Sequence, residues 1–176
     1  MRDTLGHDVD DRFGPARLAG WRRVWNVGSD EESHPERVVY RAGERFHGVM
    51  VVLGIEPTAS ARPCDGAVFP ATRYDLANLD IRERNYDRVD VTHEVSWPNK
   101  PADCEVHTYV PKPTAINRIG RAEGVRPVVV RRGYFTLVEE AFTEAGQLDS
   151  YRETTPAPPY PIVDLIVARL AEAADA

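Results

Sequence analysis

The side chains that could do chemistry are densest in residues 79–89, which read Leu-Asp-Ile-Arg-Glu-Arg-Asn-Tyr-Asp-Arg-Val. They stand where a helix is expected to end and a strand is expected to enter the core. A carboxylate at such a junction can lie in a partly desolvated pocket, where it works as a general base near neutral pH. The sequence therefore makes Glu83 the candidate catalytic residue.

The same segment also allows a purely structural role for Glu83. Asp80 and Glu83 have the spacing of a capping box, so Glu83 could simply satisfy a backbone donor. Arg82, Arg84 and Arg88 would then form a solvated face. Spacing alone favours this structural alternative, because carboxylates with a perturbed pKa are a minority in proteins.

Strands are expected to occupy most of the chain before this segment. Aromatic and β-branched residues predict a strand at 18–27. Residues 37–41 and 45–55 predict a hairpin, since the three residues between them form a short loop that contains Gly43. A further short strand is expected at 66–70.

Helices and strands are mixed in the rest of the chain. Thr72 is expected to cap a short helix, and the strict alternation of residues 86–95 predicts a strand with one buried face. Another strand is expected at 105–110, where Pro111 and Pro113 would end it. This order of elements favours an α+β fold over a regular alternation of strands and helices.

The C-terminal part is expected to be helical. Apolar residues at helical spacing predict a helix at 132–145, with Gly146 as its C-terminal stop. A proline-rich connector at 154–161 is expected to lead into a second helix, packed on a single domain formed by residues 1–153. The apolar stripe of that second helix consists of Ile162, Leu165, Ile166 and Leu170.

Two stretches resemble a known family. Residues 66–69 read Gly-Ala-Val-Phe, and residues 76–91 contain the pattern L-x-x-L-D-x-x-E-x-x-Y-x-R-x-x-V. Both are similar to the γ-glutamylcyclotransferase-like family, in which the glutamate of that pattern is the catalyst. The similarity extends from about Pro15 to Phe142. The longer pattern is fairly specific, whereas the other matches are weak when taken singly.

The resemblance implies a fold and an activity. The fold would be a small mixed β-barrel with flanking helices and an enclosed pocket. Glu83 would act as general acid/base, and Tyr86, Tyr109 and Tyr134 would bind the substrate. The α-amine of a γ-glutamyl group would attack its own γ-carbonyl, releasing 5-oxoproline and an amine or peptide. No metal or organic cofactor is implied, because an oriented intramolecular reaction needs little more than one base.

One element of the family pattern is missing. Members of the family begin with a strand and a Y-G-S loop, whose backbone amides hold an anionic group of the substrate. This chain has no such motif before Ala16, where the similarity to the following strand begins. The alternative function is therefore a non-catalytic relative that acts as a small-molecule-binding or interaction module. Loss of the strand would also leave a sheet edge bare, which promotes self-association as a homodimer.

Composition excludes several other classes of function. The net charge of −6 and the scattered basic residues argue against nucleic-acid binding. The N-terminus has no signal-peptide pattern and no stretch is long and apolar enough to span a membrane, so the cytoplasm is the expected location. Cys64 and Cys104 have no metal-binding spacing, and His93 and His107, which could face each other across strands, lack a matched carboxylate.

Overall fold

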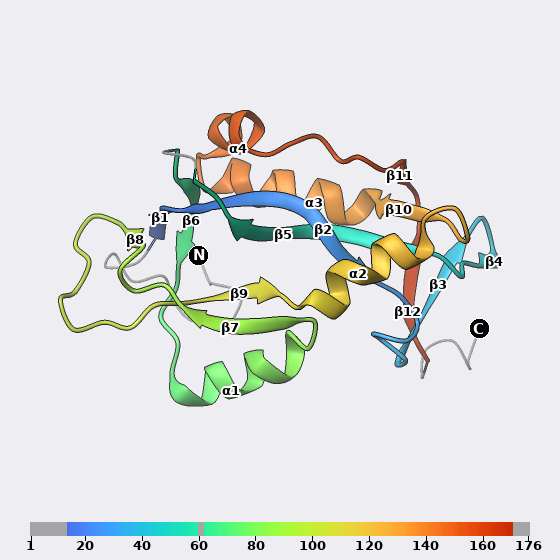
Figure 1. Cartoon of the computed structure of the whole chain (residues 1–176), viewed down its shortest axis with the longest axis horizontal. Helices are drawn as coiled ribbons and strands as arrows, with labels where there is room; N and C mark the ends of the chain where they lie inside the picture. The colour runs from blue at the N-terminus through green and yellow to red at the C-terminus, as the bar shows by residue number, and fades with distance from the viewer. Residues whose placement is uncertain (1–13, 60–61, 171–176) are drawn as a thin grey trace.

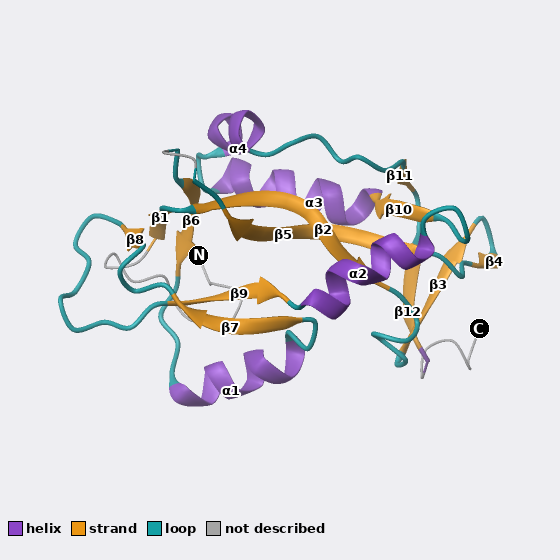
Figure 2. Cartoon of the chain, viewed as in Figure 1, coloured by secondary structure: helices purple, strands orange, loops and turns teal. Residues whose placement is uncertain are grey.

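A computed structural model describes residues 14–59 and 62–170. Its strands and helices are mixed along the chain, which confirms the α+β class (Figure 2). The helices are α1 (Arg73–Arg82), α2 (Pro113–Ala122), α3 (Arg132–Glu144) and α4 (Leu148–Thr154). The strands are β1 (Gly14–Leu18), β2 (Trp21–Ser29), β3 (Arg37–Arg41), β4 (Glu44–Arg45), β5 (Val49–Pro57), β6 (Cys64–Val68), β7 (Tyr86–Asp90), β8 (Val95–Ser96), β9 (His107–Pro111), β10 (Val128–Arg131), β11 (Ile162–Val163) and β12 (Ile166–Arg169).

The central sheet has the strand order β11-β10-β5-β2. β2 and β5 are long and antiparallel, with a register shift between Trp25 and Val27, whereas β10 runs parallel to β5 and β11. Three smaller sheets, β6-β1-β8, β12-β3-β4 and β7-β9, lie around it. Within residues 14–59 and 62–170 no sheet closes into a barrel.

The core lies where α2 and α3 pack against this central sheet. Trp25 of β2 is buried with Val49 and Val51 of β5 and with Val130 of β10, and Ile119 of α2 completes the cluster. These side chains are β-branched or aromatic on the strands, as a pleated buried surface favours. The core therefore fixes the positions of β2, β5 and α3, which carry one wall of the candidate site.

α1 and the antiparallel strand pair β7-β9 lie at the opposite side of the molecule from α4 (Figure 1). Thr72 caps α1 as predicted, through a reciprocal capping box with Asp75. The helix ends at Glu83, and the amide of Tyr86 donates to the Glu83 carbonyl at 2.8 Å as the chain turns into β7. This turn is what places the predicted catalytic segment between a helix and a strand.

Three further predictions about the elements are confirmed. The hairpin at 37–45 forms with Ala42 and Gly43 in its turn, both at positive φ, as a tight hairpin turn requires. The helix expected at 132–145 is α3, and Gly146 at φ 66° follows its end. In such a C-terminal position glycine adopts the left-handed conformation at little cost.

Other predictions are wrong. The helix expected over the stripe from Ile162 to Leu170 is replaced by β11 and β12, which pair with β10 and β3. The strand expected at 86–95 ends at Asp90, and a turn follows. The strand expected at 45–55 is interrupted after Arg45 and resumes at Val49.

Helix α2 was not predicted at all. Pro113 reads as a terminator of the preceding strand, yet it occupies the first position of α2. Proline is tolerated there, because the amide of that position has no partner inside the helix. Ala115, Ile119 and Ala122 are the buried residues of this helix.

Candidate functional site

Glu83 lies at the wall of a cavity of about 620 Å³ between α1, β6 and β9. Its side chain is 26 % exposed, and one carboxylate oxygen accepts a hydrogen bond from Nε of Arg82 at 2.8 Å. In the described part of the chain this carboxylate bonds to no backbone N–H, so the capping role that the spacing with Asp80 allowed is not observed. The Glu83 carboxylate is therefore partly buried, ionically paired and open to a cavity.

Tyr86 and Tyr134 line a second cavity of about 390 Å³. Tyr134 comes from α3, and its hydroxyl accepts a hydrogen bond from the backbone N–H of Leu53 at 3.2 Å. Its ring stands edge-on to Trp25, with 6.2 Å between the centroids. The phenol is thus held in one orientation by β5 on one side and by the core on the other.

Both phenols are held in their protonated form. Burial raises the pKa of Tyr134 to about 12, and the charges of Tyr151 and Glu83 add to the rise. Burial raises the pKa of Tyr86 as well, and Tyr134 and Glu83 contribute in the same direction. At neutral pH each hydroxyl can therefore donate a hydrogen bond to a ligand in the cavity.

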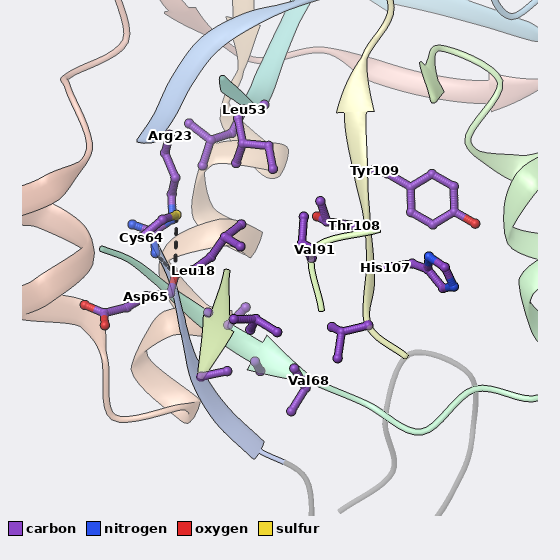
Figure 3. Close-up of a pocket in the computed structure, with 18 of the residues that line it drawn as sticks. Leu18, Arg23, Leu53, Cys64, Asp65, Val68, Val91, His107, Thr108 and Tyr109 are labelled. Atoms are coloured by element: carbon purple, nitrogen blue, oxygen red, sulfur yellow. Dashed lines mark hydrogen bonds between the residues drawn. The ribbon is translucent and has the colours of Figure 1, made fainter. Parts of the chain in front are cut away.

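Tyr109 points to the other side of β9 from Thr108 (Figure 3). Its hydroxyl donates to Asp80 of α1 at 2.8 Å, which ties β9 to the helix that ends at Glu83. Burial raises the pKa of Tyr109 to about 12, and the hydrogen bond to Asp80 and the nearby carboxylate charges of Asp80 and Glu83 add to the rise. Tyr109 lines both cavities.

The structure thus brings all four predicted site residues into one neighbourhood. Burial is the main cause that raises the pKa of Tyr86, Tyr109 and Tyr134, and the charge of Glu83 contributes to each rise. The two cavities adjoin along β9 and β6, because both are lined by Ala67, Val68 and residues 106–109. Glu83 belongs to one cavity and Tyr86 and Tyr134 to the other, with Tyr109 between them.

Sequence reasoning missed one charged residue of the second cavity, Arg23 of β2. Its side chain lines the cavity beside Leu18, Leu53 and Cys64 (Figure 3). Arg23 is only 4 % exposed, although arginine is almost never fully buried unless it is paired. Side chains alternate between the two faces of a strand, so one of Arg22 and Arg23 must point into the molecule. This alternation is the sequence signal that indicates a buried arginine.

The described part of the chain offers no metal site. It contains no group of three or more His, Cys, Asp and Glu residues that could hold an ion. His107 of β9 stands opposite Asp90, and His93 lies in the turn after β7, so the two histidines do not face each other across paired strands. Nor does any described helix have the length and apolar character needed to cross a membrane.

Comparisons with known proteins add nothing to this geometry. No protein-family model, no curated protein and no solved structure matches the chain.

Proposed function

We propose that this chain is a γ-glutamylcyclotransferase-like enzyme that cyclises a γ-glutamyl amide or peptide to 5-oxoproline. The observation that carries the proposal is the placement of Glu83 in the wall of one cavity, which adjoins a second cavity lined by Tyr86 and Tyr134, with Tyr109 lining both. The motif that suggested Glu83 also contains Tyr86, and the fold adds Tyr109 and Tyr134 from β9 and α3. A carboxylate base close to a cavity lined by neutral phenols is suited to a reaction that develops negative charge on a carbonyl oxygen.

In the proposed reaction the neutral α-amine of the γ-glutamyl group attacks its own γ-carbonyl carbon, and the Glu83 carboxylate takes one proton from the attacking nitrogen. A five-membered ring forms, with the negative charge on the former carbonyl oxygen. Collapse of this intermediate breaks the γ-amide bond, and Glu83 returns the proton to the departing amine. The products are 5-oxoproline and the amine or peptide, and no other reactant is consumed.

The tyrosines would bind and orient the substrate. The Tyr134 hydroxyl accepts its hydrogen bond from Leu53, so its own proton is available to a ligand oxygen. Holding the substrate folded, with amine and carbonyl in contact, supplies much of the rate of an intramolecular reaction. The chain therefore needs to provide one base and a restricted cavity.

The test is release of 5-oxoproline from a panel of γ-glutamyl amino acids, γ-glutamyl peptides and γ-glutamylamines. Loss of a general base is expected to lower kcat by about 10²- to 10⁴-fold in Glu83→Gln, with an unchanged circular-dichroism spectrum. Glu94→Gln is the matched control, because Glu94 is an exposed carboxylate outside both cavities. Turnover by Glu83→Gln at the wild-type rate would refute the assignment of Glu83.

A second candidate function is a non-catalytic binding module. It is favoured by the ion pair with Arg82, which engages an oxygen of the Glu83 carboxylate. In that case γ-glutamyl compounds would bind in calorimetry and release no 5-oxoproline in any variant.

The closed barrel and the homodimer that the sequence suggested stay predictions, and light scattering of the purified chain tests the dimer.

A further inference from the structure

Among the described residues, the buried guanidinium of Arg23 donates hydrogen bonds only to neutral groups. Nη1 donates to the hydroxyls of Thr154 at 3.0 Å and Thr155 at 3.3 Å, and Nη2 donates to the carbonyl oxygen of Asp65. The guanidinium also lies 4.6 Å from the ring centroid of Phe142. These contacts orient the group and leave its positive charge without a bonded anion in residues 14–59 and 62–170.

No carboxylate of the described residues forms an ion pair with Arg23. The carboxylate of Asp65, whose carbonyl oxygen accepts from Arg23, is already engaged by Arg17 at 3.3 Å and by the hydroxyl of Ser150. A buried charge that lacks an ionic partner costs considerable free energy. Burial accordingly lowers the pKa of the Arg23 guanidinium, despite the opposing influence of Cys64 and Asp65.

The Arg23 guanidinium also has N–H groups that remain available for a ligand. Arginine carries five N–H groups, and the three hydrogen bonds to described residues leave the Nε–H and one Nη2–H without an acceptor among them. Nε and Nη2 form the edge of the guanidinium that binds a carboxylate through two parallel hydrogen bonds. The residue lines the cavity of about 390 Å³.

We propose that Arg23 is the carboxylate-binding residue of this cavity. The walls beside it are apolar, with Leu18 and Leu53 close by (Figure 3) and Val138 and Phe142 contributed by α3. The ligand class is therefore a small carboxylate with an apolar body. The chain supplies the cation in advance, and the ligand supplies the missing anion.

Resting on the proposed function, this assignment also identifies which carboxylate Arg23 holds. The α-carboxylate of a γ-glutamyl group is attached to the carbon that bears the reacting amine, so it must stay beside Glu83. Glu83 lines the other cavity, and Arg23 does not. Arg23 therefore binds the carboxylate of the departing group, and the substrates are γ-glutamyl derivatives of apolar amino acids in preference to γ-glutamylamines.

The experiment compares two ligands that differ in this carboxylate alone, γ-glutamyl-leucine and γ-glutamyl-isopentylamine. Dissociation constants are measured by calorimetry on the Glu83→Gln protein, so the result does not depend on turnover. A charge-assisted bidentate contact is expected to favour γ-glutamyl-leucine by about 10- to 100-fold. Adding Arg23→Gln should reduce this ratio to about one, whereas Arg22→Gln, on the neighbouring exposed arginine that pairs with Glu56, should preserve it.

Arg23 also joins β2 to α4, so Arg23→Gln could fail to fold. A measurement on the unaltered chain covers that case: γ-glutamyl-leucine should shift the NMR signal of the Arg23 Nε–H, and γ-glutamyl-isopentylamine should not. Arg23→Lys identifies the signal by its disappearance.

Two outcomes would overturn the proposal. One is equal affinity for both ligands in the Glu83→Gln protein, and the other is a preference that survives Arg23→Gln. Arg23-dependent binding without release of 5-oxoproline would support the carboxylate site while the proposed enzyme function fails.

Discussion

Asp30 is the residue whose replacement should most clearly destabilise the attachment of α2 to the central sheet. It follows the end of β2, and its side chain is only 1 % exposed. The carboxylate forms an ion pair with Nε of Arg118 at 3.1 Å. It accepts hydrogen bonds from Nη2 of Arg126 at 2.7 Å and from the backbone N–H of Ser33 at 3.2 Å. Arg118 belongs to α2, and Arg126 follows it in the chain.

Asp30→Asn keeps the size of the side chain and removes its charge. Both arginines then face a neutral amide, and loss of one partner of a buried ion pair costs about 3–5 kcal/mol of the free energy of unfolding. With a urea dependence of about 2 kcal/mol per molar, the midpoint of urea unfolding should fall by roughly 1.5–2.5 M. Circular dichroism during urea titration measures this shift directly.

Asp103→Asn is the matched control for that measurement. Asp103 is exposed, and its replacement should change the free energy of unfolding by no more than about 0.5 kcal/mol. If the midpoint of Asp30→Asn moves no further than that of Asp103→Asn, the buried ion pair does not stabilise the fold as argued.

Two further predictions concern the elements that position the site. Thr72→Ala removes the capping box of α1 and should lower the free energy of unfolding by about 1 kcal/mol, with faster hydrogen exchange of the α1 amides; unchanged exchange would contradict the role of the cap. Because the pKa of Tyr134 is raised to about 12, the folded state keeps this proton longer than the unfolded state, whose tyrosines ionise near pH 10. The contribution to stability is therefore fully present below about pH 10 and declines at up to about 1.4 kcal/mol per pH unit as the pH rises toward 12. In a pH titration, tyrosinate absorbance should show a phase near pH 12 that is smaller in Tyr134→Phe. If that phase keeps its full size in the variant, it belongs to another tyrosine.

Elements with a strong local signal could be predicted from the sequence. The capping box at Thr72, the Gly43 turn and the helical stripe of 132–145 each specify their structure through neighbouring residues. Such signals need no knowledge of the rest of the fold.

Elements that depend on distant partners could not be predicted from the sequence. The spacing of Ile162, Leu165 and Ile166 fits a helix, but the β-branched residues of this stretch pair with β10 and β3 instead. Tertiary pairing overrides local periodicity here. For α2 the error is the opposite one: Pro113 indicates the end of a strand, yet proline is also favoured at the first position of a helix.

The residues of the candidate site also fall into those that the sequence alone indicates and one that only the fold indicates. A contiguous pattern contained Glu83 and Tyr86, and the sequence also singled out Tyr109 and Tyr134. Arg23 could not be chosen over Arg22 without the register of β2 against β5 and its irregularity after Trp25. Strand alternation tells which residues share a face, and only the packed fold tells which face is inside.

The pairing of β12 with β3 has a consequence for biosynthesis. Tyr40 of β3 pairs with Ile166 of β12, so the two halves of this ladder leave the ribosome far apart in time. At a synthesis rate of about 5–20 residues per second, the delay is roughly 6–25 s. During that interval the nascent β3-β4 hairpin presents an unsatisfied edge to any other extended segment. Slower translation should prolong this exposure, and a co-expressed holdase chaperone should raise the yield of folded protein.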